Sequence, residues 1–329
     1  MKIGIISFTK AGSQLAEKAG RVLEMHGYRC RIDKWQNGMS LSDWTRDCWK
    51  ENQGIVFVGA AGIAVRTIAP FLKDKFTDPA VVVMDEKGRF AIPLASGHMG
   101  GANRLAEVLG QELHAIPVIT TATDVNHLFA VDVFARENHL YLTDRRLAKQ
   151  VSARLLEGNV IGWKADWGEF PAPKGFALPE LDEQNGLTVW ITISDQEKAG
   201  YLKLIPRAVV IGIGCRKGTD GEVLGRAVDQ MLEQHHISRS AVLGVATIDI
   251  KEKEPAIAEL VTARGWELFS YTAEELGNVE GEFSESDFVK QTVGVGNVCE
   301  RAVVCSGAEL IAKKTLFSGI TAALGVMKR

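Results

Sequence analysis

A histidine in the segment ASGHMGGANR, residues 95–104, lies between a predicted strand and a predicted helix. Residues 89–94 before it read as a strand, and residues 105–109 after it place apolar side chains at the spacing of one helix face. The first amide groups of a helix lack partners within the helix, and the helix dipole places partial positive charge there. Because Gly100 and Gly101 allow a ligand to approach this backbone closely, two interpretations stay open: an anion site, or a tight turn with a surface histidine.

His98 is the predicted catalytic residue of this segment. Imidazole is the side chain whose unperturbed pKa lies near neutrality, so it can accept and return a proton under physiological conditions. The surrounding backbone and side chains are predicted to bind the ligand, and they are Ser96, Gly97, Gly100, Gly101, Asn103 and Arg104.

Two further loops follow predicted strands, GAAGIAVR at residues 59–66 and TTATDVN at residues 120–126. Ligands of open α/β sheets bind outside the carboxyl ends of the strands. We therefore expect these loops and residues 95–104 to converge on one crevice. The binding residues predicted from the two loops are Gly59, Gly62, Arg66 and Asp124.

The segment VIGIGCRKG, residues 210–218, invites a test for nucleotide binding. The dinucleotide fingerprint Gly-x-Gly-x-x-Gly fails because Lys217 occupies the third glycine position, and no Gly-Lys-Ser/Thr sequence completes a phosphate-binding loop. What remains is a turn with Gly214, Arg216 and Lys217, which either binds carboxylates or phosphates through charge-assisted hydrogen bonds or is simply solvated.

A last glycine-rich segment, TVGVGNVCERAVVCSG at residues 292–307, contributes Asn297 as a predicted binding residue. Cys299 is a candidate nucleophile, but no histidine lies nearby in sequence to activate it, which favours a buried structural thiol. No His/Glu cluster has metal-ligand spacing, so we expect no catalytic metal bound by the protein.

Composition limits the class of protein. The chain has 329 residues, of which 46% are hydrophobic and 24% charged, as in an ordinary globular protein with more than one domain. A net charge of -3 argues against a nucleic-acid partner, and no apolar run of about 18 residues is available to span a membrane. Five cysteines without a Cys-x-x-Cys pair favour a reducing compartment, and we expect the cytoplasm.

Alternating strands and helices predict an α/β fold, with two open α/β-sheet domains joined by a small middle segment. The expected boundaries are 1–138, 139–205 and 206–329. Within them we expect a hairpin of residues 80–84 and 89–94, a strand over 117–121, and a helix over 139–156. Tryptophans of the middle segment are expected in the core and at interfaces rather than in contact with a ligand.

Six segments together resemble the CbiG family of cobalamin biosynthesis. GIVFVGAAGIAVRTIAP, PLASGHMGGANRLA and VITTATD resemble its amino-terminal domain. VIGIGCRKGTDGEVLGRA, TIDIKEKEPAIAEL and VGVGNVCERAVVCSG resemble its CobE-like carboxyl-terminal domain. The resemblance covers nearly the whole chain, and the segments occur in the order that the family has.

The resemblance implies a cobalt-precorrin-5A hydrolase, an enzyme that acts on a carbon–carbon bond. Such an enzyme opens the δ-lactone of a ring-contracted cobalt tetrapyrrole and releases acetaldehyde. It implies no cofactor, since the cobalt belongs to the substrate, and it makes other corrin-pathway enzymes expected partners. His98 would be the base, and the amides of residues 100–102 would stabilise the oxyanion.

Two alternatives remain at this point. A non-catalytic carrier or chaperone for a corrinoid intermediate would have no need of a titrating group such as His98. A nucleotide-dependent enzyme is disfavoured by the failed glycine fingerprints.

Overall fold

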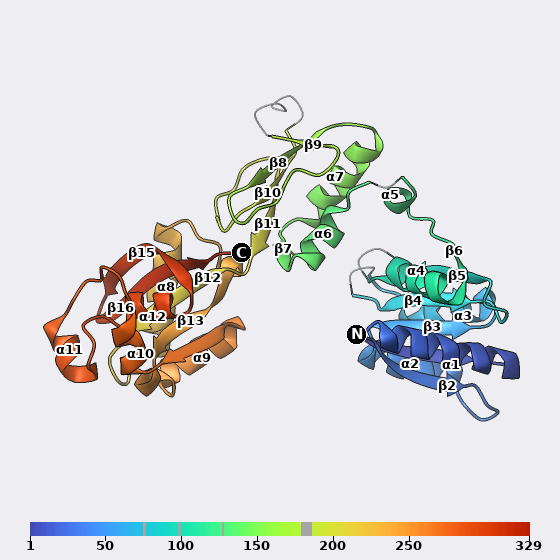
Figure 1. Cartoon of the computed structure of the whole chain (residues 1–329), viewed down its shortest axis with the longest axis horizontal. Helices are drawn as coiled ribbons and strands as arrows, with labels where there is room; N and C mark the ends of the chain where they lie inside the picture. Colours follow the sequence, from blue (N-terminus) through green and yellow to red (C-terminus); the bar gives the residue numbers. More distant parts are fainter. Residues whose placement is uncertain (75–76, 98–99, 127, 179–185) are drawn as a thin grey trace. The chain divides into compact units, whose positions relative to one another are not determined.

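The structure is a computed structural model that describes residues 1–74, 77–97, 100–126, 128–178 and 186–329 (Figure 1). The chain divides into two compact units, Met1–Val133 and Phe134–Arg329, each described by itself. The division after Val133 groups the middle segment with the carboxyl-terminal domain.

The first unit contains a six-stranded sheet in the order β2-β1-β3-β4-β5-β6. The strands are β1 (Lys2–Ser7), β2 (Arg29–Lys34), β3 (Gly54–Val58), β4 (Ala80–Met84), β5 (Phe90–Ala95) and β6 (Ile116–Pro117). The pairs among β2, β1, β3 and β4 are parallel, whereas β5 runs antiparallel to β4 and parallel to β6. The predicted hairpin is therefore confirmed.

Helices cover both faces of this sheet, because its central strands are apolar on both sides. Val56 and Val58 of β3 pack with α1 (Lys10–Met25) and α4 (Ala102–Leu113), whereas Ile55 and Phe57 pack with α2 (Leu41–Glu51) and α3 (Ala61–Ile68). This alternation follows from the two-residue period of a strand. A short 3-10 helix (Ala69–Phe71) and α5 (Ala122–Val125) complete the elements of the first unit, and α6 (Val131–Glu137) spans the division of the chain.

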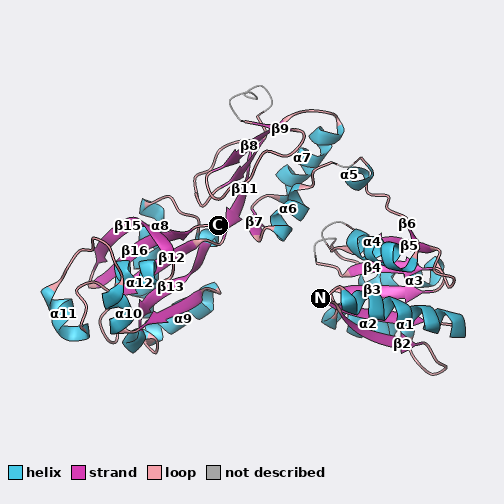
Figure 2. Cartoon of the chain, viewed as in Figure 1, coloured by secondary structure: helices cyan, strands magenta, loops and turns pink. Residues whose placement is uncertain are grey.

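The second unit begins with a five-stranded sheet in the order β7-β11-β10-β8-β9. Figure 2 shows the strands of this sheet in magenta beside helix α7. Its strands are β7 (Leu140–Leu142), β8 (Ile161–Ala165), β9 (Phe176–Ala177), β10 (Thr188–Ile191) and β11 (Tyr201–Pro206). Trp163 is 2% exposed and packs edge-on against Phe134 and Phe176, which confirms it as a core residue.

The expected helix over 139–156 is wrong in its first turns. Residues Leu140–Leu142 instead pair antiparallel with β11, and α7 spans only Arg145–Leu156. Asp144 explains the boundary, since its carboxylate accepts hydrogen bonds from the amides of Arg146 and Leu147 and caps the helix. The expected strand over 117–121 is likewise wrong, because β6 ends at Pro117 and the chain turns into α5.

The carboxyl-terminal sheet has the order β14-β13-β12-β16-β15. Its strands are β12 (Val209–Gly214), β13 (Val242–Ile248), β14 (Glu267–Tyr271), β15 (Ala308–Phe317) and β16 (Ile320–Met327). The first three run parallel and β16 runs antiparallel to β12. The α/β fold class is thus confirmed, with a third sheet where a small connecting segment was expected.

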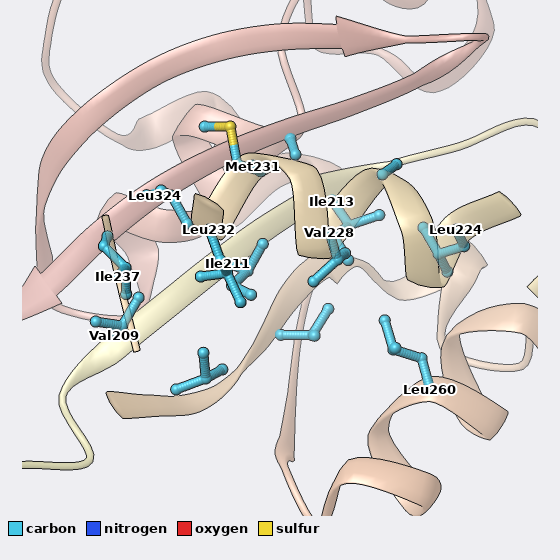
Figure 3. Packing of buried hydrophobic residues seen from close by; sticks show 14 of the residues in the cluster. Val209, Ile211, Ile213, Leu224, Val228, Met231, Leu232, Ile237, Leu260 and Leu324 are labelled. Atoms are coloured by element: carbon cyan, nitrogen blue, oxygen red, sulfur yellow. The ribbon is translucent and has the colours of Figure 1, made fainter. Parts of the chain in front are cut away.

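Its helices are α8 (Gly221–Gln234), α9 (Pro255–Arg264), α10 (Ala273–Asn278), α11 (Asp287–Val293) and α12 (Cys299–Cys305). Figure 3 shows one face of the sheet, where Ile211 and Ile213 of β12 meet Leu224 and Val228 of α8 and Leu260 of α9. The other face packs against α10 and α12. This two-sided packing fixes the carboxyl end of β12. We call the segment that follows it, residues 214–218 with Arg216 and Lys217, the basic loop.

Candidate functional site

The predicted convergence of three loops in the first unit is wrong for one of them. Strand β5 runs antiparallel to β4, so Ala95 at its carboxyl end lies beside Val81, whereas Met84 lies beside Ala91. The amide of Gly59 donates to the carbonyl of Met84 over 2.8 Å, which places residues 59–66 at the opposite edge of the sheet from residues 95–104. Gly59, Gly62 and Arg66 therefore do not join the loop that follows β5.

The structure does bring residues 95–104 and 120–126 together. The side-chain amide of Asn103 donates hydrogen bonds to the carboxylate of Asp124 and, over 3.2 Å, to the hydroxyl of Thr121. Asn103 is only 7% exposed, so these bonds form away from bulk water. Because β6 runs parallel to β5, the segments that follow the two strands reach the same edge.

The start of α4 is pinned by the backbone that precedes it. The amide of Ala102 donates to the carbonyl of Ser96 over 3.2 Å, and the amide of Asn103 donates to the carbonyl of Gly97 over 2.9 Å. Ala102 is therefore not available as an oxyanion donor, contrary to expectation. The amides of Gly100 and Gly101 remain the candidates.

His98 and Ser96 are the two side chains of this loop that could take part directly in chemistry. His98, the predicted base, lies outside the described residues. Ser96 has a left-handed backbone with a φ of 53°, its side chain is among the buried polar groups at 8% exposure, and no described residue bonds its hydroxyl.

The remaining predicted residues of the first unit lie on its surface. Arg104 is exposed and its guanidinium lies 3.6 Å from the carboxylate of Glu107. Arg66 is exposed in the last turn of α3, and Gly62 has open space where a side chain would extend. These positions can meet a ligand without rearrangement, but at two different edges of the sheet.

In the second unit, Glu254 anchors the basic loop that follows β12. Its carboxylate accepts a hydrogen bond from the amide of Gly218 over 2.7 Å and contacts the ammonium of Lys251 at 3.1 Å. Burial alone would raise the pKa of this carboxyl, but the Gly218 amide, Lys251 and Lys217 outweigh it and hold the pKa below its usual value. The side chains of Arg216 and Lys217 remain exposed beside Gly214, as an anion site requires.

Sequence reasoning missed Glu254, although it lies directly before Pro255, the first residue of α9. Proline at the first helical position marks a helix start, and a carboxylate at that point is a candidate for binding amides. Its partner Gly218 lies 36 residues away, and no local pattern identifies that pairing.

Asn297, predicted to bind a ligand, is buried at 1% exposure and bonded within the protein. Its amide nitrogen donates to the carbonyl and hydroxyl of Ser284 over 2.9 and 2.8 Å, and its oxygen accepts from the amide of Glu300 over 2.9 Å. These contacts give Asn297 a structural role at the start of α12 rather than a free binding group.

Cys299 is also buried, at 1% exposure. Burial raises the pKa of its thiol to about 11, so little thiolate is present near neutral pH. This environment agrees with a structural thiol and disfavours the nucleophile.

Two hollows in the second unit are lined by none of the predicted site residues. One, of about 850 Å³, includes Trp163, Lys164 and Tyr201 in its wall. The other, of about 460 Å³, lies near the amino ends of β12 and β13 and includes Arg207, Arg239 and Arg264.

The three arginines of the smaller hollow are engaged within the protein. Arg239 and Arg264 both pair with Asp229, at 2.9 and 3.0 Å. Arg207 donates to backbone carbonyls, including that of Gly265 over 2.9 Å. We assign these arginines to holding this edge of the sheet together.

Over the described part of the chain, no three His, Cys, Asp or Glu side chains are grouped so that they could hold a metal ion. No described helix has both the length and the apolar character needed to cross a membrane. The absence of a resident metal stays a prediction.

Comparison with known proteins covers both units. A family model described as cobalamin synthesis G N-terminal matches residues 43–124, and one described as cobalamin synthesis G C-terminus matches residues 209–325. A cobalt-precorrin-5A hydrolase from Salmonella typhimurium is 36% identical, with 98% of this chain and 97% of the relative covered. One from Priestia megaterium is 31% identical, with 94% and 91% covered.

Among solved structures, a cobalamin biosynthesis protein G homologue from Sulfolobus solfataricus aligns with 99% of this chain and 97% of its own. Its sequence identity is 22% and the TM-score is 0.44.

Proposed function

We propose that this chain, which belongs to the CbiG family of cobalt-precorrin-5A hydrolases, opens the δ-lactone of a ring-contracted cobalt tetrapyrrole and releases acetaldehyde. The observation that carries this proposal is the similarity over nearly the full length to relatives of that name, at 36% and 31% identity. Both the loop after β5 and the basic loop after β12 fall inside the matched regions.

Lactone opening needs an activated oxygen nucleophile and donors for the negative charge that develops on the carbonyl oxygen. We assign the donors to the amides of Gly100 and Gly101 at the start of α4, where the helix dipole also favours negative charge. We assign proton removal to His98, on the strength of its type and its position between Gly97 and these glycines in the sequence.

Acetaldehyde release then follows as a retro-aldol-like step. A base removes the proton of the hydroxyl group on the two-carbon unit, the carbon–carbon bond to the macrocycle breaks, and its electron pair passes to the conjugated ring system. His98 would serve as the base in this step as well. No organic cofactor enters either step, and the cobalt ion enters as part of the substrate.

The substrate carries several carboxylates, which suit exposed cationic side chains. Arg104 at the loop after β5 and Arg216 and Lys217 after β12 are the proposed partners. All three side chains are exposed, so each cationic group is accessible to a carboxylate. The same proposal makes other corrin-pathway enzymes the expected donors and recipients of the intermediate. The cytoplasm is the proposed location, supported by five free cysteines.

The test is incubation of the purified protein with the lactone-bearing cobalt corrinoid, with acetaldehyde measured through alcohol dehydrogenase and NADH. Wild-type protein should release acetaldehyde. The His98→Asn variant should still bind the corrinoid but should release acetaldehyde much more slowly. Undiminished release by the variant would remove His98 from the mechanism. Tight binding of the corrinoid without any release of acetaldehyde by the wild type would instead favour a carrier. The nucleotide-dependent alternative is tested separately: addition of NAD or ATP should leave the Tm of the protein unchanged.

A further inference from the structure

The hydroxyl of Ser96 is buried without a hydrogen-bond partner among the described residues. Ser96 as a whole is 8% exposed, so its hydroxyl lies inside the loop rather than on the surface. Buried hydroxyl groups are nearly always bonded, and an exception in a loop of interest calls for an explanation. A ligand that bonds to this oxygen would supply one.

The side chain of Ser96 faces the start of α4. A Cβ atom placed on Gly100 would lie 2.3 Å from the Cβ of Ser96, so these two residues are in direct contact across the turn. The amides assigned to the oxyanion are those of Gly100 and its neighbour Gly101. The Ser96 side chain and the residues that carry the candidate oxyanion donors are therefore direct neighbours.

The backbone at Ser96 adds a second feature. Its φ of 53° is a conformation that residues other than glycine adopt rarely. It persists because the carbonyls of Ser96 and Gly97 accept hydrogen bonds from the amides of Ala102 and Asn103. A serine held at a sharp turn between a strand and a helix is the arrangement by which some hydrolases present a nucleophile next to their oxyanion donors.

We propose that Ser96 is the nucleophile that opens the lactone, through a covalent acyl-enzyme. This inference rests on the proposed function, because a lactone is an ester and its opening is an acyl transfer. The Ser96 Oγ forms a bond to the lactone carbonyl carbon, the bond between that carbon and the ring oxygen breaks, and the serine proton ends on the released ring oxygen. Water then hydrolyses the ester, which regenerates Ser96 and leaves the carboxylic acid on the tetrapyrrole.

The experiment combines acid quenching with mass spectrometry of the intact protein and its peptides. Opening of a lactone expels no fragment, so wild-type protein quenched early with the lactone corrinoid should gain the full mass of the substrate. If acetaldehyde has already left the bound intermediate, the gain should be smaller by the mass of acetaldehyde. The added mass should map to the peptide that contains Ser96. Ser96→Ala should show no adduct, and its kcat for acetaldehyde release should fall by about a thousand-fold or more.

Thr45→Val is the matched control. Thr45 is the other buried hydroxyl of the first unit without a described partner, but it lies within α2 on the face of the sheet opposite α4. Its replacement should leave both the adduct and kcat unchanged.

The outcomes separate this inference from the proposed function. Acetaldehyde release by Ser96→Ala at the wild-type kcat, or a raised KM with unchanged kcat, would overturn the nucleophile and leave the hydrolase in place. An adduct on Ser96 without acetaldehyde would support the nucleophile and contradict the full reaction. Absence of any adduct in the wild type at every quench time, with active release, would favour direct attack by water and would also overturn the inference.

Discussion

Asn103 and Asp124 are joined by a side-chain hydrogen bond although 21 residues separate them in sequence. The bond connects the first turn of α4 to the short helix α5, and Thr121 accepts a second bond from the same amide group. Together these contacts hold two loops at one edge of the six-stranded sheet. Two of the predicted binding residues thus depend on each other for their positions.

Replacing Asn103 with alanine should destabilise the first unit and slow acetaldehyde release. Loss of a buried donor between two acceptors costs about 1–3 kcal/mol in the free energy of unfolding. Urea denaturation measures this change. Arg104→Ala is the neighbouring control for stability, because its side chain is exposed and a surface ion pair contributes under about 1 kcal/mol. Equal losses in both variants would contradict a special role for the Asn103 contacts.

Two glycines should respond oppositely to alanine. A Cβ on Gly97 would lie 2.7 Å from the Oδ1 of Asn103, so Gly97→Ala should displace that side chain and lower Tm. Gly62 lies in α3 with nothing within 4 Å of a Cβ, so Gly62→Ala should be tolerated or raise stability by up to about 1 kcal/mol. Thermal unfolding compares the two variants, and a stable Gly97→Ala protein would show that Asn103 is not held as described.

Corrinoid binding should depend on the loop after β12. Arg216→Ala should raise KM with little change in kcat, because a contact made equally in substrate and transition state affects binding alone. Arg207→Gln is the control at the other end of the six-residue strand, about 20 Å away. An unchanged KM in Arg216→Ala would remove this loop from the site.

The Glu254 carboxylate should make stability depend on pH. Its pKa in the folded protein lies below the ordinary value of 4.5, so its contribution is fully present above that pH and is lost as the pH falls through the lowered value. Glu254→Gln should therefore be less stable than wild type near pH 7, and the difference should shrink in acid. Denaturant unfolding from pH 3 to 7 measures this, with the exposed Glu252→Gln as control. A difference that grows in acid would have the wrong sign.

The thiol of Cys299 should be unreactive in the folded protein. It is buried, and its pKa is raised to about 11. Iodoacetamide at pH 8, followed by peptide mass spectrometry, should label it only after unfolding. Rapid labelling of Cys299 in the native protein would contradict its assignment as a buried structural thiol and would make it a candidate nucleophile again.

The α/β class was predictable from sequence because strands and helices have different apolar periods, and each period is a local property. Most elements were located on this basis. Strand β7 was missed because its partner β11 lies about 60 residues later in the chain. The sequence prediction therefore included residues 140–142 in the helix that became α7. The pairing, not the local propensity, decides its conformation.

The sequence by itself determined that glycine-rich loops follow strands and that residues 80–84 and 89–94 form a hairpin. Only the tertiary structure decided which loops meet. The hairpin reverses the chain, so residues 59–66 lie at one edge of the sheet and residues 95–104 and 120–126 at the other. The tertiary structure likewise decided that Asn297 is buried and that the Glu254 carboxylate bonds the amide of Gly218. It also left the hydroxyl of Ser96 without a partner among the described residues. Contacts of this kind depend on strand direction and packing across long stretches of chain, which no local pattern of residues specifies.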